Sequence, residues 1–232
     1  NISMSKKKIL LFGSQSEIGQ KIYEVLNEEN LVIPLHRGFK FRKEHFELTY
    51  DSFDKAIEWC NFSKEYIYDA DITIFNQAFT SLLSLENINN IELSKSFQVN
   101  VFFPTAIIKF LLSQNLSKRR KFIFLSSIAG NFRSSTASMA YSSSKRALNG
   151  IIKHLSLEKG GEADFIGIAP SQVDSKQLRE KIPESKIKEL KQKNPTNSIC
   201  KVEEIASFVK YIVDHPGSSF NGSIFDMNGG IF

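Results

Sequence analysis

Tyr141 and Lys145, two residue types capable of acid–base chemistry, stand four positions apart in the stretch Ser138 to Asn149. This stretch reads as the opening of a helix, where four residues make about one turn and both side chains leave the same face. A phenol has an unperturbed pKa of about 10, and an ammonium beside it favours the phenolate and lowers that pKa. Tyr141 would then be a usable general acid or base. The same spacing also arises by chance on helix surfaces.

Two further polar residues could complete such a site. Ser127 follows the apolar run Lys121 to Leu125, which predicts a strand, and its hydroxyl could hold a substrate oxygen against the Tyr141 hydroxyl. Asn100 is a polar residue inside the apolar, helix-like stretch Leu93 to Ser113. It could hold a water beside Lys145, or it could simply bond a neighbouring backbone carbonyl.

A glycine-containing loop joins the first apolar run to the first amphipathic helix. Lys7 to Phe12 predicts a strand, Gly13 to Gly19 the loop, and the helix carries its apolar residues on one face at Ile18, Ile22, Val25 and Leu26. A strand that turns through glycine into a helix N-terminus offers backbone N–H groups and the positive end of a dipole to an anion. The loop is therefore either a diphosphate site or an ordinary turn between strand and helix.

Arg37 lies just after the second predicted strand, Leu31 to Leu35, about 20 residues beyond the glycines. In a dinucleotide-binding fold an acid at this place bonds the ribose 2′-hydroxyl, whereas an arginine accommodates a 2′-phosphate. Because this strand end carries no acid, Arg37 favours NADP(H) over NAD(H), although NAD(H) is possible. The alternative is a solvated loop arginine in the basic stretch Arg37 to Lys43.

Strand and helix patterns alternate along the rest of the chain. The further predicted strands are His45 to Thr49, Asp71 to Phe75, Asp164 to Ala169 and Ser223 to Met227. The further predicted helices are Phe53 to Tyr66, Leu93 to Ser113, Tyr141 to Gly160 and Glu203 to Val213. This alternation predicts right-handed βαβ units and one domain over residues 4–232, a doubly wound parallel sheet with helices on both faces. Asn76 ends a strand at the edge where such sheets bind ligands, or it only forms a turn.

Composition narrows the function classes. At 232 residues and 41% hydrophobic, the chain can bury one sizeable core. The net charge of +5 is dispersed without an arginine-rich tract, so we expect no nucleic-acid partner. No apolar run approaches the ~18 residues of a membrane span. Two distant cysteines without clustered histidines predict free thiols, no metal site and a cytoplasmic location. Asn1 to Ser3 precede Met4, and we expect them to be a remnant rather than a targeting signal.

Together these motifs resemble the short-chain dehydrogenase/reductase family over Lys7 to Gly230. The loop from Phe12 to Gly19 is similar to the family's T-G-x-x-x-G-x-G sequence. Glu47-Leu48-Thr49 resembles its D-[LV]-[TS] segment, and the stretch Asn76-Gln77-Ala78-Phe79 resembles its N-N-A-G segment. Asn100, Ser127 and the Tyr141/Lys145 pair resemble its catalytic residues, and Pro170 to Ser175 its P-G-x-[VI]-x-T segment. Three family glycines are replaced here, by Glu17, Phe79 and Ser171.

The resemblance implies a Rossmann-like fold and hydride transfer between a nicotinamide dinucleotide and a carbonyl or secondary alcohol. It implies catalytic roles for Asn100, Ser127, Tyr141 and Lys145, and homodimers or homotetramers. The cofactor contacts expected with it are Gly13, Ser16, Ile18, Gly19, Arg37, Glu47, Leu48, Asn76, Ala78, Tyr141, Lys145, Pro170, Val173 and Ser175. A non-catalytic dinucleotide-sensing or scaffold module of the same fold is the alternative.

The segment of about residues 171–200 is expected to be a mobile lid over the substrate, because long excursions at the carboxyl end of a strand are usually functional. Lys176 to Lys193 contains seven basic residues against three acidic ones. A lid of that sign would favour an anionic carbonyl compound. The alternative is a solvated helical face whose lysines maintain solubility.

Overall fold

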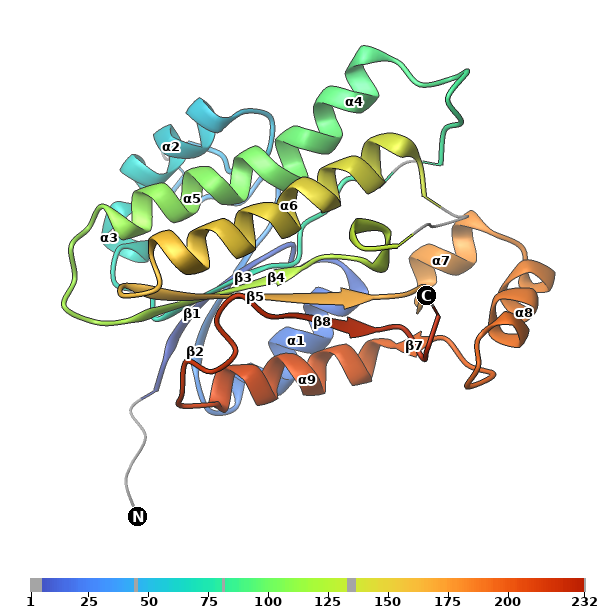
Figure 1. Cartoon of the computed structure of the whole chain (residues 1–232). Helices are drawn as coiled ribbons and strands as arrows, with labels where there is room; N and C mark the ends of the chain where they lie inside the picture. Colours follow the sequence, from blue (N-terminus) through green and yellow to red (C-terminus); the bar gives the residue numbers. More distant parts are fainter. Residues whose placement is uncertain (1–5, 44–45, 81, 133–136, 232) are drawn as a thin grey trace.

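The computed structural model describes residues 6–43, 46–80, 82–132 and 137–231. A central sheet lies between two layers of helices (Figure 1). The expected remnant Asn1 to Ser3 lies outside the described residues, as does His45.

All six strands of the central sheet run parallel, in the order β2-β1-β3-β4-β5-β8. Their bounds are β1 Lys8–Phe12, β2 Leu31–Leu35, β3 Ile72–Phe75, β4 Arg120–Leu125, β5 Ala163–Pro170 and β8 Ile224–Met227. The chain winds outward from β1 to β2 and then crosses back to β3, so the strand order reverses between β1 and β3. The predicted doubly wound parallel sheet is therefore confirmed, and a reversal of this kind opens a crevice at the carboxyl ends of the strands.

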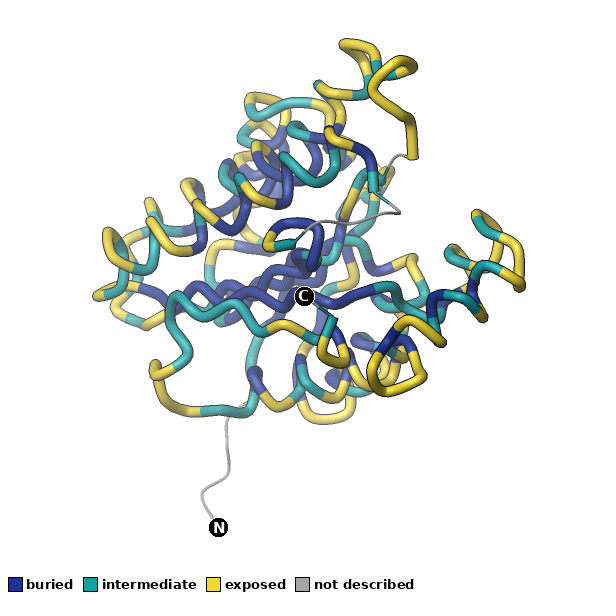
Figure 2. Tube along the Cα trace, turned by 45° about the vertical axis from the view of Figure 1, so that its right-hand side comes forward, coloured by how far each residue is buried: buried dark blue, intermediate teal, exposed yellow. Residues whose placement is uncertain are grey.

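Alternating side chains give the sheet two chemically different faces. Along β4, Phe122 and Phe124 enter one core cluster, whereas Ile123 and Leu125 enter the other. The aromatic cluster is covered by α2 (Phe53–Phe62), α5 (Phe103–Leu112) and α6 (Met139–Glu158), and α4 (Asn90–Phe97) packs against α6. The aliphatic cluster is covered by α1 (Glu17–Asn27) and α9 (Val202–Asp214). Figure 2 shows the result: the sheet and the inner sides of the helices are buried, and the outer sides are exposed.

The predicted strand His45 to Thr49 is wrong for its described residues, because 46–49 form no strand. The segment folds back on the loop after β2 instead: Leu48 N–H donates to the Phe39 carbonyl (2.9 Å), and Gly38 N–H donates to the Leu48 carbonyl (2.9 Å). Leu48 is nevertheless fully buried in the aromatic cluster. Its apolar side chain produced the strand-like pattern, although its backbone partners lie in a loop.

The predicted helix Leu93 to Ser113 begins earlier, at Asn90, and contains a π-helical turn over Gln98–Phe102. Pro104 explains the turn, since it has no N–H to donate to the carbonyl of Asn100 four residues earlier. Phe103 N–H donates to the Gln98 carbonyl, five residues back. The predicted helix Phe53 to Tyr66 is likewise divided at Ser63, with the short α3 following over Lys64–Ile67.

Residues 171–200 form an excursion beyond the carboxyl ends of the strands (Figure 1), and its expected mobility as a lid stays a prediction. It contains β6 (Val173–Asp174), α7 (Lys176–Lys181) and α8 (Glu184–Lys193), and β6 pairs with β7 (Cys200–Lys201). A small cluster of Ile187, Leu190 and Ile199 gives it its own apolar contacts. Across the described residues, none of the helices is long and apolar enough to cross a membrane.

Candidate active site

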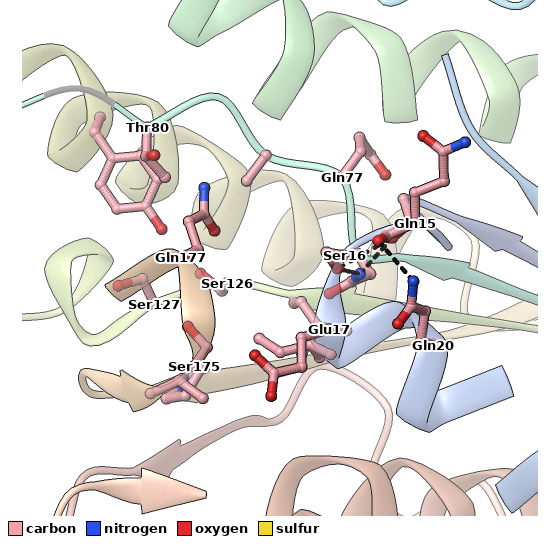
Figure 3. A pocket seen from close by; sticks show the side chains of 18 of the residues that line it. Gln15, Ser16, Glu17, Gln20, Gln77, Thr80, Ser126, Ser127, Ser175 and Gln177 are labelled. Carbon is pink, nitrogen blue, oxygen red and sulfur yellow. Dashed lines mark hydrogen bonds between the residues drawn. The ribbon is translucent and has the colours of Figure 1, made fainter. Parts of the chain in front are cut away.

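A cleft of about 700 Å³ opens where the parallel strands end (Figure 3). Its lining comes from the ends of β4 and β5, from the loops that follow β1, β2 and β3, and from the starts of α1, α6 and α7. Most of the site residues expected from the sequence contribute to this lining: Gly13, Ser16, Ile18, Arg37, Asn76, Ala78, Ser127, Tyr141, Lys145, Pro170, Val173 and Ser175. Gly19, Glu47, Leu48 and Asn100 do not.

The loop after β1 leaves no room for side chains at its two glycines. Gly13 has a φ of +77°, and a Cβ atom there would lie 2.5 Å from the Gln77 nitrogen. A Cβ atom at Gly19 would lie 2.3 Å from the Gly13 carbonyl oxygen. Asn76 Nδ2 donates to that same carbonyl (2.8 Å) and to Ser16 Oγ (2.9 Å). Asn76 therefore fixes the loop, and Gly19 shapes the cleft from behind without lining it.

The first turn of α1 faces this cleft. Ser16 is its N-cap, and the Ser16 hydroxyl accepts from Gly19 N–H at 3.1 Å. The early N–H groups of a helix and its positive dipole favour an anion. With glycines that let a ligand approach the backbone closely, the loop fits the diphosphate of a dinucleotide.

Glu17 departs from the family pattern at this place, and the structure gives its carboxylate a partner. Glu17 Oε2 accepts from the backbone N–H of Lys176 at 2.7 Å, which joins the start of α1 to the start of α7. In Figure 3 the Glu17 side chain extends from α1 toward Ser175. The carboxylate is thus held at the side of the cleft formed by α7.

Ser127, Tyr141 and Lys145 lie together on the opposite wall. The helix carrying Tyr141 begins there because the Ser138 hydroxyl caps it, accepting from Tyr141 N–H at 3.2 Å. Ser127 is the N-cap of a short helical turn after β4. Lys145 Nζ donates to the Leu125 carbonyl at 2.8 Å and lies 5.7 Å from the centroid of the Tyr141 ring.

The electrostatics of this wall differ from the expectation. Burial lowers the pKa of Lys145 to about 7. Burial also raises the pKa of Tyr141, and a hydrogen bond with the Ser127 side chain works against that rise. The expected lowering of the Tyr141 pKa by Lys145 is therefore not found. The physical reason is that the buried ammonium is itself destabilised and is directed to a carbonyl rather than to the phenol oxygen.

Asn100 is buried in the π-helical turn and does not line the cleft, but its side chain contacts the elements that form this wall. Its Oδ1 accepts from Phe79 N–H (2.9 Å), and its Nδ2 donates to the Phe79 carbonyl (3.2 Å) and to Ser144 Oγ (2.9 Å). Ser144 Oγ in turn donates to the Tyr141 carbonyl at 2.8 Å. Asn100 thus connects the loop after β3 to the turn of α6 that carries Tyr141.

Arg37 and Tyr50 mark the far end of the cleft. The exposed Arg37 guanidinium carbon lies 5.6 Å from the centroid of the Tyr50 ring. Tyr50 was not among the site residues expected from the sequence, yet it lines the cleft although it is only 6% exposed. The sequence feature that could have indicated Tyr50 is its position directly after the family-like segment Glu47-Leu48-Thr49. Glu47 itself is exposed and lies 3.9 Å from Lys40, whereas Leu48 is buried in the core, so these two lie outside the cleft.

A second, mainly apolar cavity of about 210 Å³ shares Ser127 and Tyr141 with the cleft. The segment 171–200 contributes one of its sides, including Val173, Leu178 and Ile182. The two hydroxyls therefore stand between the cleft that fits a dinucleotide and a smaller cavity of different character.

Comparison with known proteins places this geometry in a family. Residues 40–231 match the family model described as Enoyl-(Acyl carrier protein) reductase. The curated protein "Dehydrogenase/reductase SDR family member 6" of Aquarana catesbeiana is 28% identical over 148 residues, which are 58% of this chain and 58% of that protein. The chain thus matches little more than half the length of this relative.

Solved structures share the fold. The structure described as "ElxO with NADP Bound" is 18% identical, with a TM-score of 0.83 over 97% of this chain and 98% of that one. A 3-oxoacyl-[acyl-carrier protein] reductase with bound NAD from Brucella melitensis is also 18% identical, with a TM-score of 0.79 over 99% and 92%. With the match over residues 40–231, the chain belongs to the short-chain dehydrogenase/reductase family, whose enzymes depend on NAD or NADP.

Proposed function

We propose that this protein is an NAD(P)(H)-dependent oxidoreductase that interconverts a carbonyl compound and a secondary alcohol. The observation that carries the proposal is the placement of Ser127, Tyr141 and Lys145 on one wall of a cleft whose other wall is the glycine loop. A dinucleotide held by Gly13, Ser16 and Ile18 would supply or accept the hydride in that cleft.

Tyr141 is the proton donor for reduction in this proposal. Its hydroxyl is held by Ser127, whose own hydroxyl can also orient the substrate oxygen. Lys145, with a pKa lowered to about 7, can hold or release a proton near neutral pH beneath the Tyr141 ring. Asn100 keeps Tyr141 in place through Ser144, and the water that it was expected to hold remains part of the proposal.

The cofactor preference proposed is NADP(H). Arg37 is exposed at one end of the cleft. Tyr50 and Gly13 of the glycine loop line the same cleft. The Arg37 guanidinium can make a charge-assisted bond to a 2′-phosphate. Glu47, the acidic residue that matches the family's D-[LV]-[TS] segment, lies outside the cleft and so does not oppose a phosphate there. We also propose that the substrate is a small anionic carbonyl compound, and that the protein forms a homodimer or homotetramer in the cytoplasm.

Turnover tests this function directly. The full chain is incubated with NADPH or NADH and a panel of ketones, and cofactor oxidation is followed. Tyr141→Phe removes the transferable proton but keeps the ring, so kcat should fall by about 10²–10⁴-fold while cofactor binding persists. Tyr211→Phe, an exposed tyrosine on α9, is the matched control and should retain activity.

Two outcomes would count against the proposal. Wild-type turnover by Tyr141→Phe would show that another group donates the proton. Tight dinucleotide binding without turnover of any ketone or alcohol would instead indicate a sensing or scaffold module of the same fold.

A further inference from the structure

The smaller cavity beside Ser127 and Tyr141 is lined mainly by apolar groups. They come from several separate segments of the chain, and among them are Leu82, Ile128, Ala129, Leu178 and Ile182. Its volume of about 210 Å³ equals the share of roughly seven water molecules in the liquid, so it suits a small organic body. An apolar wall next to the two hydroxyls predicts that a substrate places its carbonyl at Tyr141 and its hydrocarbon part against α7.

Lys181, the last residue of α7, contributes the one ammonium among the residues that line this cavity. Its Nζ donates to the hydroxyl of Thr80 at 2.6 Å. Thr80 belongs to the loop after β3, so this bond joins α7 to that loop. Within the described ranges, no carboxylate forms a salt bridge with Lys181. A neutral hydroxyl leaves the charge of an ammonium uncompensated, and an incoming anion would compensate it.

The other basic side chains of this segment have different surroundings. Arg179 bonds the carboxylates of Asp174 and Glu184, and Lys186 and Lys193 both bond Glu189. Lys191 lies 3.3 Å from Asp174. Four of the seven basic side chains of the segment therefore have carboxylate partners away from the smaller cavity, and Lys181 is the cation that lines it.

We propose that Lys181 determines substrate specificity by binding an anionic group, so that the preferred substrates are compounds with a carbonyl, a short apolar body and a terminal carboxylate. This inference rests on the proposed oxidoreductase function. The carbonyl lies between Ser127 and Tyr141, the apolar body contacts Leu178 and Ile182, and the carboxylate reaches the Lys181 ammonium, replacing or joining Thr80. Because Lys181 is exposed, solvent weakens this contact and its effect on kcat/KM is modest.

The experiment compares straight-chain keto acids of increasing length, each with its near-isosteric keto amide. In the wild type, the acid of the best length should exceed its amide in kcat/KM by about 3- to 10-fold, and added salt should reduce that ratio. Lys181→Gln should abolish the preference, mainly by raising KM for the acid, whereas its kcat/KM for the amide should stay the same.

Three variants separate charge from a merely structural contact. Lys181→Arg keeps the charge and should keep the preference for the acid. Thr80→Val breaks the bond to Lys181 without removing the ammonium, so the preference should also survive there. Lys188→Gln removes an exposed lysine of α8 and should change nothing.

The inference is overturned if acids and amides are used equally, or if Thr80→Val loses the preference as Lys181→Gln does, because Lys181 would then only fasten α7. The oxidoreductase proposal survives either result, since neutral ketones are still reduced. Failure of every ketone, acid or neutral, would instead overturn the oxidoreductase proposal.

Discussion

The floor and the rim of the cleft are built in different ways. The floor consists of Gly13, Gly19, Asn76 and Lys145, which are fixed by main-chain contacts or by burial. The rim consists of Arg37 and Glu17, with Lys181 beside it in the smaller cavity, and all three make their contacts through the ends of long side chains. A changed floor residue disturbs the backbone or the core, whereas a changed rim residue disturbs one contact. The floor should therefore determine whether the protein binds a dinucleotide at all, and the rim which cofactor and substrate it prefers.

The largest effect is expected for Gly19→Ala in the floor. The new Cβ atom would meet the Gly13 carbonyl oxygen at 2.3 Å, and that backbone atom can move only with the loop. Overpacking of this kind costs about 1–3 kcal/mol or more of unfolding free energy, and we expect cofactor affinity to fall at least about tenfold. Urea unfolding and cofactor titration measure the two losses.

Gly150→Ala is the matched control for that substitution. Gly150 lies in α6 with no atom within 4 Å of a built Cβ, so alanine there should be neutral or stabilise by up to about 1 kcal/mol. Similar behaviour of the two variants would show that the close approach in the loop is not needed.

An intermediate effect is expected for Lys145→Met, which should change how the unfolding free energy depends on pH. The folded protein lowers the pKa of Lys145 from 10.5 to about 7, so between these values the unfolded chain holds a proton that the folded chain lacks. The unfolding free energy should therefore rise with pH above about 7 through this residue. From about pH 7 to 8.5 this contribution is about 1–2 kcal/mol in the cofactor-free protein.

Chemical unfolding at several pH values checks this expectation. Lys145→Met should lose the rise, whereas Lys153→Met, which removes an exposed lysine from the same helix, should keep it. If both variants follow the wild-type curve, Lys145 is charged in the folded protein across that range.

The smallest effect is expected at the rim, for Arg37→Ala. Removal of one exposed charge should weaken NADP(H) binding by about 3- to 10-fold and leave NAD(H) binding nearly the same, since NAD(H) has no 2′-phosphate. Lys40→Ala, in the same basic stretch but close to Glu47, is the control. Equal affinities of the wild type for both cofactors would remove Arg37 from the site.

Local sequence patterns were sufficient for the parts of the molecule that are buried on all sides. The strands of the central sheet are short apolar runs because helices cover both faces, so their pattern is strong. The glycine loop and the Ser127, Tyr141 and Lys145 set follow directly from strand ends and helical spacing. These residues line one cleft, and their catalytic and cofactor-binding roles stay predictions.

The structure departs from the apolar pattern where backbone hydrogen bonds, which that pattern does not report, decide the local conformation. Leu48 looked like part of a strand, but its backbone bonds to Gly38 and Phe39. The π-helical turn at Asn100 depends on the missing N–H of Pro104, which interrupts a helix that the apolar pattern alone would continue. The sequence also showed the excess of lysine and arginine in the excursion, although which of them are paired depends on the folded arrangement of α7 and α8.

Trp59 gives the protein an optical property of its own. It is the sole tryptophan in the sequence, is 1% exposed, and its ring lies 6.0 Å from that of Phe12, the residue just before Gly13. All indole fluorescence therefore originates at one site in the core, close to the start of the glycine loop. Its emission should shift to longer wavelength in a single step when the core opens. A reduced nicotinamide in the cleft would quench it by energy transfer, so binding can be followed without a label.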